Sequence, residues 1–150
     1  MPMIYYSRSQ KLEAEQQLGA RKVSFEELLR KSDVLSVHCA LNPDTRGLFN
    51  AAAFNQMKST AIFINTSRGP VHHQKDLYQA LVSGKIWGAG LDVTNPEPMH
   101  ADDPLLTLEN VAVTPHIGSA TVEARDEMSR LAAQNIIQYY KGEQIDNLVN

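Results

Sequence analysis

Residues 60–70, "TAIFINTSRGP", decide the fold class of this 150-residue chain. The apolar run at 60–65 has the length of a buried strand, and it stops at a polar loop that contains glycine and proline. A helical pattern then covers residues 73–82, and Gly84 is suited to cap that helix in the left-handed conformation. The stretch therefore predicts one strand–loop–helix unit of an α/β protein.

The same alternation of short apolar runs and helices extends in both directions from this unit. Further strands are predicted at residues 3–6, 33–38, 87–93 and 111–114, and further helices at 10–18, after Ser24, at 50–57 and at 121–140. The pattern predicts a doubly wound parallel α/β sheet with strands buried on both faces and a long C-terminal helix. Ligands of such sheets bind beyond the carboxyl ends of the strands, which makes the loops at 66–70, 94–98 and 115–119 the candidate site.

Composition argues against several classes of protein. The chain is 43% apolar and 21% charged, and its net charge of -3 comes without a run of Lys or Arg, so neither nucleic acid nor an anionic membrane is an expected partner. Cys39 is the only cysteine, which excludes an internal disulfide and a cysteine-based zinc cluster and favours a reducing compartment. Because no apolar run approaches the ~18 residues of a membrane span and no signal-peptide pattern is present, we expect a water-soluble, cytoplasmic protein.

Three chemically versatile side chains follow three different predicted strands. They are Arg68, Glu97 and His116, and each lies in one of the candidate loops. Taken singly, each such residue is more often structural or simply solvated. The carboxyl ends of parallel strands lie at one edge of a sheet, so the three residues can converge there and form a candidate catalytic set.

The stretches "NTSRGPVHHQKDLYQALVSGKIWGAGLDVTNPEP" (65–98) and "PLLTLENVAVTPHIGSAT" (104–121) carry a family resemblance. They resemble the NAD(P)-dependent D-2-hydroxyacid dehydrogenases, closest to the glyoxylate, hydroxypyruvate and 2-ketogluconate reductases. The resemblance implies that Arg68 binds the substrate carboxylate and carbonyl, that Glu97 pairs with His116, and that His116 donates the proton. It also implies that Asp92 binds the nicotinamide carboxamide, that the reaction reduces a small 2-keto acid with NAD(P)H, and that the protein is a homodimer.

The residue types suit that reaction. A guanidinium binds a planar carboxylate through two parallel hydrogen bonds and stays charged at any relevant pH. Hydride transfer to the keto carbon leaves charge on the oxygen, and a histidine with an ordinary pKa near 6.5 can neutralise it by donating a proton. A neighbouring carboxylate such as Glu97 raises the pKa of that histidine.

Cofactor choice is predicted from the residues after the first predicted strand, which face the adenosine ribose in this fold. Ser7, Arg8 and Ser9 offer hydrogen-bond donors to a 2′-phosphate, and no acidic residue precedes Glu13. We therefore expect NADP(H) in preference to NAD(H), with NAD possible. By resemblance, the further cofactor-binding residues are Ala40, Thr66, Ser67, Gly118 and Ser119. No metal site is expected, because no known ligand spacing is present.

The resemblance also predicts the organisation of the chain. The glycine-rich dinucleotide motif G-x-G-x-x-G is expected before residue 3 and is absent from this sequence. We therefore expect residues 1–120 to form a partial, Rossmann-like NAD(P)-binding domain and residues 121–150 to form the crossing helix and tail of a substrate domain. Such a truncated chain is expected to bind dinucleotide weakly and to have little or no activity alone. The alternative is a non-catalytic dinucleotide-sensing or protein-interaction module of the same fold.

Overall fold

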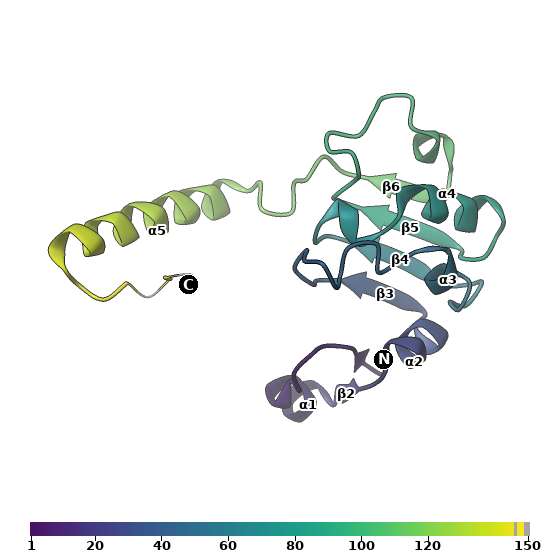
Figure 1. The fold of residues 1–150 in the computed structure, drawn as a ribbon, viewed down its shortest axis with the longest axis horizontal. Helices are drawn as coiled ribbons and strands as arrows, with labels where there is room; N and C mark the ends of the chain where they lie inside the picture. Colours follow the sequence, from purple (N-terminus) through teal and green to yellow (C-terminus); the bar gives the residue numbers. More distant parts are fainter. Residues whose placement is uncertain (146, 149–150) are drawn as a thin grey trace. The chain divides into compact units, whose positions relative to one another are not determined.

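The computed structural model describes residues 1–145, 147 and 148 and divides the chain into two compact units. The first unit is Met1–Pro115 and contains all the strands that the structure describes (Figure 1). The second unit begins at His116 and contains the helix α5 (Val122–Lys141).

A parallel sheet forms the centre of the first unit, as the sequence predicted, but it contains four of the five predicted strands, and the strand predicted at 3–6 lies outside it. Its strands are β3 (Val34–Val37), β4 (Ile62–Asn65), β5 (Gly88–Leu91) and β6 (Val111–Val113), and they lie in the order β3-β4-β5-β6 (Figure 1). All neighbouring pairs are parallel. This order places the loops after β4 and β5 next to one another at one edge of the sheet, with the end of β6 beside that of β5.

A separate pair of short strands precedes this sheet. Strand β1 (Ile4–Tyr5) pairs in parallel with β2 (Arg21–Lys22), and the helix α1 (Leu12–Leu18) connects them. The sequence predicted β1 but not β2, because two exposed cationic residues carry no apolar strand pattern. The helix α2 (Phe25–Lys31) then begins at Ser24, whose hydroxyl accepts a hydrogen bond from the Glu27 N–H at 3.1 Å, as its capping-box spacing predicted.

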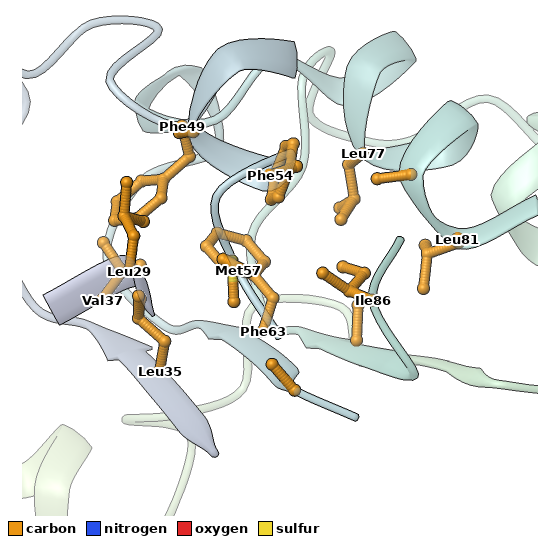
Figure 2. Packing of buried hydrophobic residues seen from close by; sticks show 14 of the residues in the cluster. Leu29, Leu35, Val37, Phe49, Phe54, Met57, Phe63, Leu77, Leu81 and Ile86 are labelled. Atoms are coloured by element: carbon orange, nitrogen blue, oxygen red, sulfur yellow. The ribbon is translucent and has the colours of Figure 1, made fainter. Parts of the chain in front are cut away.

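The hydrophobic core lies between the four-stranded sheet and the helices α3 (Ala51–Phe54) and α4 (Gln74–Val82), which cover the same face of the sheet (Figure 2). Phe63 of β4 is fully buried, and its ring centroid lies 5.3 Å from that of Phe54 and 5.1 Å from that of Phe49. The prediction that every strand is buried on both faces is wrong for β6, which has no buried residue, and for β3. The residues of β3 alternate between exposed and buried, with Val34 exposed and Leu35 buried, because the described helices pack on one face there.

Several helix ends follow from local sequence. Asn50 caps α3 by accepting hydrogen bonds from two backbone N–H groups, but α3 ends at Phe54 and is shorter than the predicted helix at 50–57. Two short 3-10 helices, η1 (Gly69–Val71) and η2 (Pro104–Thr107), lie in segments predicted as loops. The predicted long C-terminal helix is confirmed: Thr121 caps α5, and Gly142 ends it with a φ of 68°. In the described part of the chain, no helix has both the length and the apolar character needed to cross a membrane.

Candidate active site

The loop after β4 carries Arg68, and the side chain of Asn65 sets its conformation. Asn65 is fully buried, and its Oδ1 accepts hydrogen bonds from the Ser67 N–H and the Ser67 hydroxyl, both at 3.0 Å. Its Nδ2 donates to the Arg68 carbonyl at 3.1 Å and lies 2.9 Å from Nδ1 of His72. The Arg68 residue itself is exposed, and its Nη1 donates to the Ser67 carbonyl at 2.7 Å. A single buried amide therefore holds the backbone that presents this guanidinium.

Gly69 brings this loop into direct contact with the loop after β5. A Cβ atom on Gly69 would lie only 1.8 Å from the carbonyl oxygen of Thr94, a distance that no side chain could occupy. The Asp92 N–H also donates to the Asn65 carbonyl at 3.0 Å, which joins the two loops at their strand ends. The structure thus places the loop that contains Arg68 directly against the loop that continues to Glu97.

Glu97 is an exposed residue in the segment between β5 and η2. Gln74, a buried residue at the start of α4, binds this segment at two points. Its Oε1 accepts a hydrogen bond from the Asn95 N–H at 2.8 Å, and its Nε2 donates to Asp103 at 2.6 Å. Asp103 in turn caps η2 by accepting from the Leu105 N–H at 2.9 Å. The helix that follows the Arg68 loop therefore also fixes the course of the Glu97 loop.

The third predicted catalytic residue, His116, belongs to the second unit, in which Gly118 and Ser119 also lie. It is exposed, and its φ of 54° is in the left-handed region that residues other than glycine seldom adopt. The residues just before it are anchored in the first unit, because the Thr114 N–H donates to the Leu91 carbonyl at 2.8 Å and the Thr114 hydroxyl donates to Asp92. The grouping of His116 with Arg68 and Glu97 stays a prediction.

The predicted cofactor residues Ser7 and Arg8 follow β1 and lie beside a second cationic residue. The Ser7 hydroxyl donates to the Ser9 carbonyl, and the exposed Arg8 receives a hydrogen bond at its carbonyl from Nζ of Lys22 at 3.2 Å. The sequence analysis missed Lys22, which reaches this position because β1 pairs with β2.

The donor set around the strand ends fits a nicotinamide dinucleotide. Hydroxyl groups of Thr66 and Ser67 and the cationic groups of Arg8 and Lys22 are chemically suited to phosphate and ribose oxygens. The carboxylate of Asp92, nearly buried at the end of β5, is suited to accept from an amide N–H. Ala40 follows β3, and its carbonyl accepts a hydrogen bond from the Thr45 hydroxyl at 2.7 Å.

Sequence reasoning also missed the side chains that support the site. Asn65, His72 and Gln74 are buried polar residues inside or beside apolar segments. A polar residue at the end of an apolar strand, three positions before an arginine, was the available signal for Asn65. Within residues 1–145, 147 and 148, no group of three His, Cys, Asp or Glu side chains could hold a metal ion.

Comparison with known proteins gives the family. The model of the "D-isomer specific 2-hydroxyacid dehydrogenase, NAD binding domain" family matches residues 1–118. This chain belongs to that family. The glyoxylate reductase/hydroxypyruvate reductase of Homo sapiens is 51% identical to this chain over 140 residues. These residues are 93% of this chain and 43% of the human protein. The glyoxylate reductase of Thermococcus litoralis is 49% identical over 150 residues, which are 100% of this chain and 45% of that protein.

Solved structures of D-2-hydroxyacid dehydrogenases have the same fold. A holo form of D-mandelate dehydrogenase from Rhodotorula graminis matches with a TM-score of 0.91 and 38% identity, over 97% of this chain and 43% of the solved chain. The chain thus spans less than half the length of each of these three relatives. The NAD-binding domain of the dehydrogenase family implies a nicotinamide dinucleotide as its cofactor.

Proposed function

We propose that the protein carrying this chain reduces a small 2-keto acid to the D-2-hydroxy acid with NAD(P)H. The observation that carries the proposal is the close contact of Gly69 with Thr94, which packs the Arg68 loop against the Glu97 loop at the carboxyl ends of the strands. Relatives named glyoxylate and hydroxypyruvate reductases support these two acids as substrates, and 2-ketogluconate belongs to the same chemical class.

Each catalytic residue has a distinct role in this proposal. Arg68 binds the substrate carboxylate through its guanidinium fork and orients the neighbouring carbonyl. His116 donates a proton to the carbonyl oxygen as the carbon is reduced, so that a neutral hydroxyl leaves the site. Glu97 stabilises the protonated imidazole of His116, so that His116 carries the proton it donates. The bound nicotinamide dinucleotide supplies the hydride.

Ser7, Arg8, Ala40, Thr66, Ser67, Asp92, Gly118 and Ser119 bind the cofactor in this proposal. NADP(H) is preferred to NAD(H), because Arg8 and Lys22 place two cationic side chains after β1 and on β2, where a 2′-phosphate needs neutralising charge. No carboxylate that would repel this phosphate lies between Tyr6 and Gln10. Residues 1–120 act as part of the cofactor domain, and residues 121–150 belong to the part that completes the substrate domain.

The protein is further proposed to be a homodimer in the cytoplasm. The dimer rests on the resemblance of the two motif stretches at 65–98 and 104–121 to dehydrogenases that pair through their cofactor domains. The compartment rests on the single cysteine, which is half-buried and forms no disulfide. Size-exclusion chromatography with light scattering and localisation of a tagged protein test these two points.

Steady-state kinetics of the protein expressed from its complete reading frame test the function. Oxidation of NADPH is followed with glyoxylate, hydroxypyruvate and 2-ketogluconate as substrates. In the variant Arg68→Ala, kcat/KM for the preferred acid is expected to fall about 100-fold or more, because two charge-assisted hydrogen bonds to the carboxylate are lost. Arg46→Ala, which changes an arginine in the turn after β3, serves as the matched control and is expected to retain activity. A wild-type protein that reduces none of the three acids would contradict the proposal.

A further inference from the structure

The side chain of Asn65 is fully buried, and each of its hydrogen-bonding positions has a partner. The two lone pairs of Oδ1 face the Ser67 N–H and hydroxyl, and the two N–H bonds of Nδ2 face the Arg68 carbonyl and Nδ1 of His72. A carboxamide has two acceptor and two donor positions, so no position of the Asn65 side chain lacks a hydrogen-bond partner.

The backbone partners fix which way this amide points. The Ser67 N–H can only donate, so Oδ1 must face it, and the Arg68 carbonyl can only accept, so Nδ2 must face it. Nδ2 therefore also faces His72, whose Nδ1 must accept a hydrogen bond at 2.9 Å. The proton of a neutral His72 imidazole accordingly resides on Nε2.

His72 is held in this neutral form by its surroundings. The residue is 1% exposed, and its ring packs against Phe63 with centroids 5.9 Å apart. Burial, with a smaller contribution from the charge of His73, lowers the pKa of His72 to about 4. The imidazole thus remains an acceptor at Nδ1 throughout the neutral pH range.

The other ring nitrogen shows that the imidazole does not serve packing alone. Nε2 is buried and has no hydrogen-bond partner within the described part of the chain. A buried donor without a partner destabilises the fold, and an apolar side chain of similar size would avoid that penalty. What an imidazole provides here that leucine cannot is the acceptor at Nδ1, and its partner is the residue that shapes the Arg68 loop.

We propose that His72 is a positioning residue for substrate binding: through Asn65, it fixes the backbone of residues 65–69 so that Arg68 presents its guanidinium to the carboxylate of the 2-keto acid. The inference rests on the proposed function for the role of Arg68. If Nδ1 is removed, one Asn65 N–H is left unpaired, the amide can rotate, and the hydrogen bonds to Ser67 and Arg68 are lost together.

Two substitutions at His72 separate positioning from packing in the protein made from its complete reading frame. His72→Leu keeps buried volume and removes the acceptor, whereas His72→Asn places a carbonyl oxygen near the position of Nδ1 and leaves a cavity. We expect KM for glyoxylate to rise about tenfold in His72→Leu and to return to within about threefold of the wild-type value in His72→Asn. Thermal stability is expected to follow the opposite order, with the asparagine variant the less stable of the two. His73→Leu, at the exposed neighbouring histidine, is the control and is expected to leave KM unchanged.

A purely structural role for His72 gives a different result. It predicts that KM for glyoxylate stays at the wild-type value in His72→Leu, or that the less stable His72→Asn has the higher KM, and either outcome overturns the inference. A wild-type protein without reductase activity contradicts the proposed function instead. In that case, nitrogen NMR of 15N-histidine-labelled protein still decides the geometry. We expect an unprotonated Nδ1 and a protonated Nε2 for His72 near neutral pH, and the reverse tautomer overturns the inference.

Discussion

At the scale of single residues, Gly69 is the position on which the contact between the two site loops depends. The atoms nearest to an added Cβ are the carbonyl oxygen of Thr94 at 1.8 Å and the carbonyl carbon at 2.3 Å. Both belong to the backbone, so no side-chain rotation can relieve the clash and one of the loops must move. The chemistry proposed for Arg68 and Glu97 therefore depends on a residue that has no side chain.

We predict that Gly69→Ala destabilises the protein by about 1 to 3 kcal/mol, the range typical of overpacked sites, and raises KM for the keto acid. Thermal unfolding and steady-state kinetics measure the two effects. Gly84→Ala is the control: Gly84 has a φ of 67° with nothing within 4 Å of the added Cβ, so a stability loss of about 1 kcal/mol without a change in KM is expected. An unchanged melting temperature in Gly69→Ala would show that the two loops are not in contact.

At the scale of elements, the pairing of β1 with β2 determines what surrounds the adenosine end of the predicted cofactor site. Arg8 lies three residues after β1, and the register of Tyr5 with Lys22 carries the Lys22 side chain to the Arg8 carbonyl. Both side chains belong to exposed residues, so their charges are available to a solvated phosphate group.

For NADP(H) preference, we predict that Arg8→Ala raises KM for NADPH by about tenfold and leaves KM for NADH within about twofold, because only the 2′-phosphate interacts with the guanidinium. Lys22→Ala is expected to act in the same direction with a smaller magnitude, since an ammonium group makes no bidentate contact. Arg30→Ala, at an exposed arginine of α2, is the matched control. Equal changes in KM for the two cofactors in Arg8→Ala would refute the assigned role.

The strands differ in whether the sequence alone predicts them. Strands β3 to β6 were predicted because each is a short run rich in apolar residues, and their parallel order follows from the helices and loops between them. Strand β2 has no such pattern: it exists because the Met3 and Tyr5 carbonyls accept hydrogen bonds from the Arg21 and Val23 N–H groups. Such a pairing depends on the rest of the fold and leaves no local signal.

The same distinction applies to the site. Arg68, Glu97 and His116 were predicted because each follows a predicted strand and occupies a family motif, and Asp92 because it occupies a family motif within the predicted strand at 87–93. Gln74 was not predicted, because its role arises from partners far along the chain: it accepts from the Asn95 N–H 21 positions away and donates to Asp103 29 positions away. Which buried polar side chain supports a loop is a property of tertiary packing, and a strand-and-loop pattern does not encode it.

At the scale of the whole molecule, two groups give the stability of the fold a predictable dependence on pH. Burial lowers the pKa of His72 from 6.5 to about 4. Hydrogen bonds from Lys31 and then Arg21 lower the pKa of the exposed carboxylate of Glu27 from 4.5 to about 2. In both cases the unfolded chain binds the proton more readily than the folded chain, so each contribution is present above the unfolded pKa and is lost as the pH falls toward the folded pKa.

The two groups therefore act in different pH windows, His72 between 6.5 and about 4 and Glu27 between 4.5 and about 2. We predict that the wild-type free energy of unfolding falls by an amount on the order of 3 kcal/mol across the upper window as His72 in the unfolded chain takes up its proton. His72→Leu is expected to abolish this slope and keep the one in the lower window. Glu27→Gln is expected to keep the upper slope and to reduce the lower one without abolishing it, because other carboxylates with a lowered pKa also titrate there: Glu15, Glu26 and Glu127. Urea unfolding at a series of pH values from about 7.5 to 3 measures both slopes. An upper slope that persists in His72→Leu would mean that another group titrates there and that His72 is not the buried, neutral imidazole on which the geometry of the Arg68 loop depends.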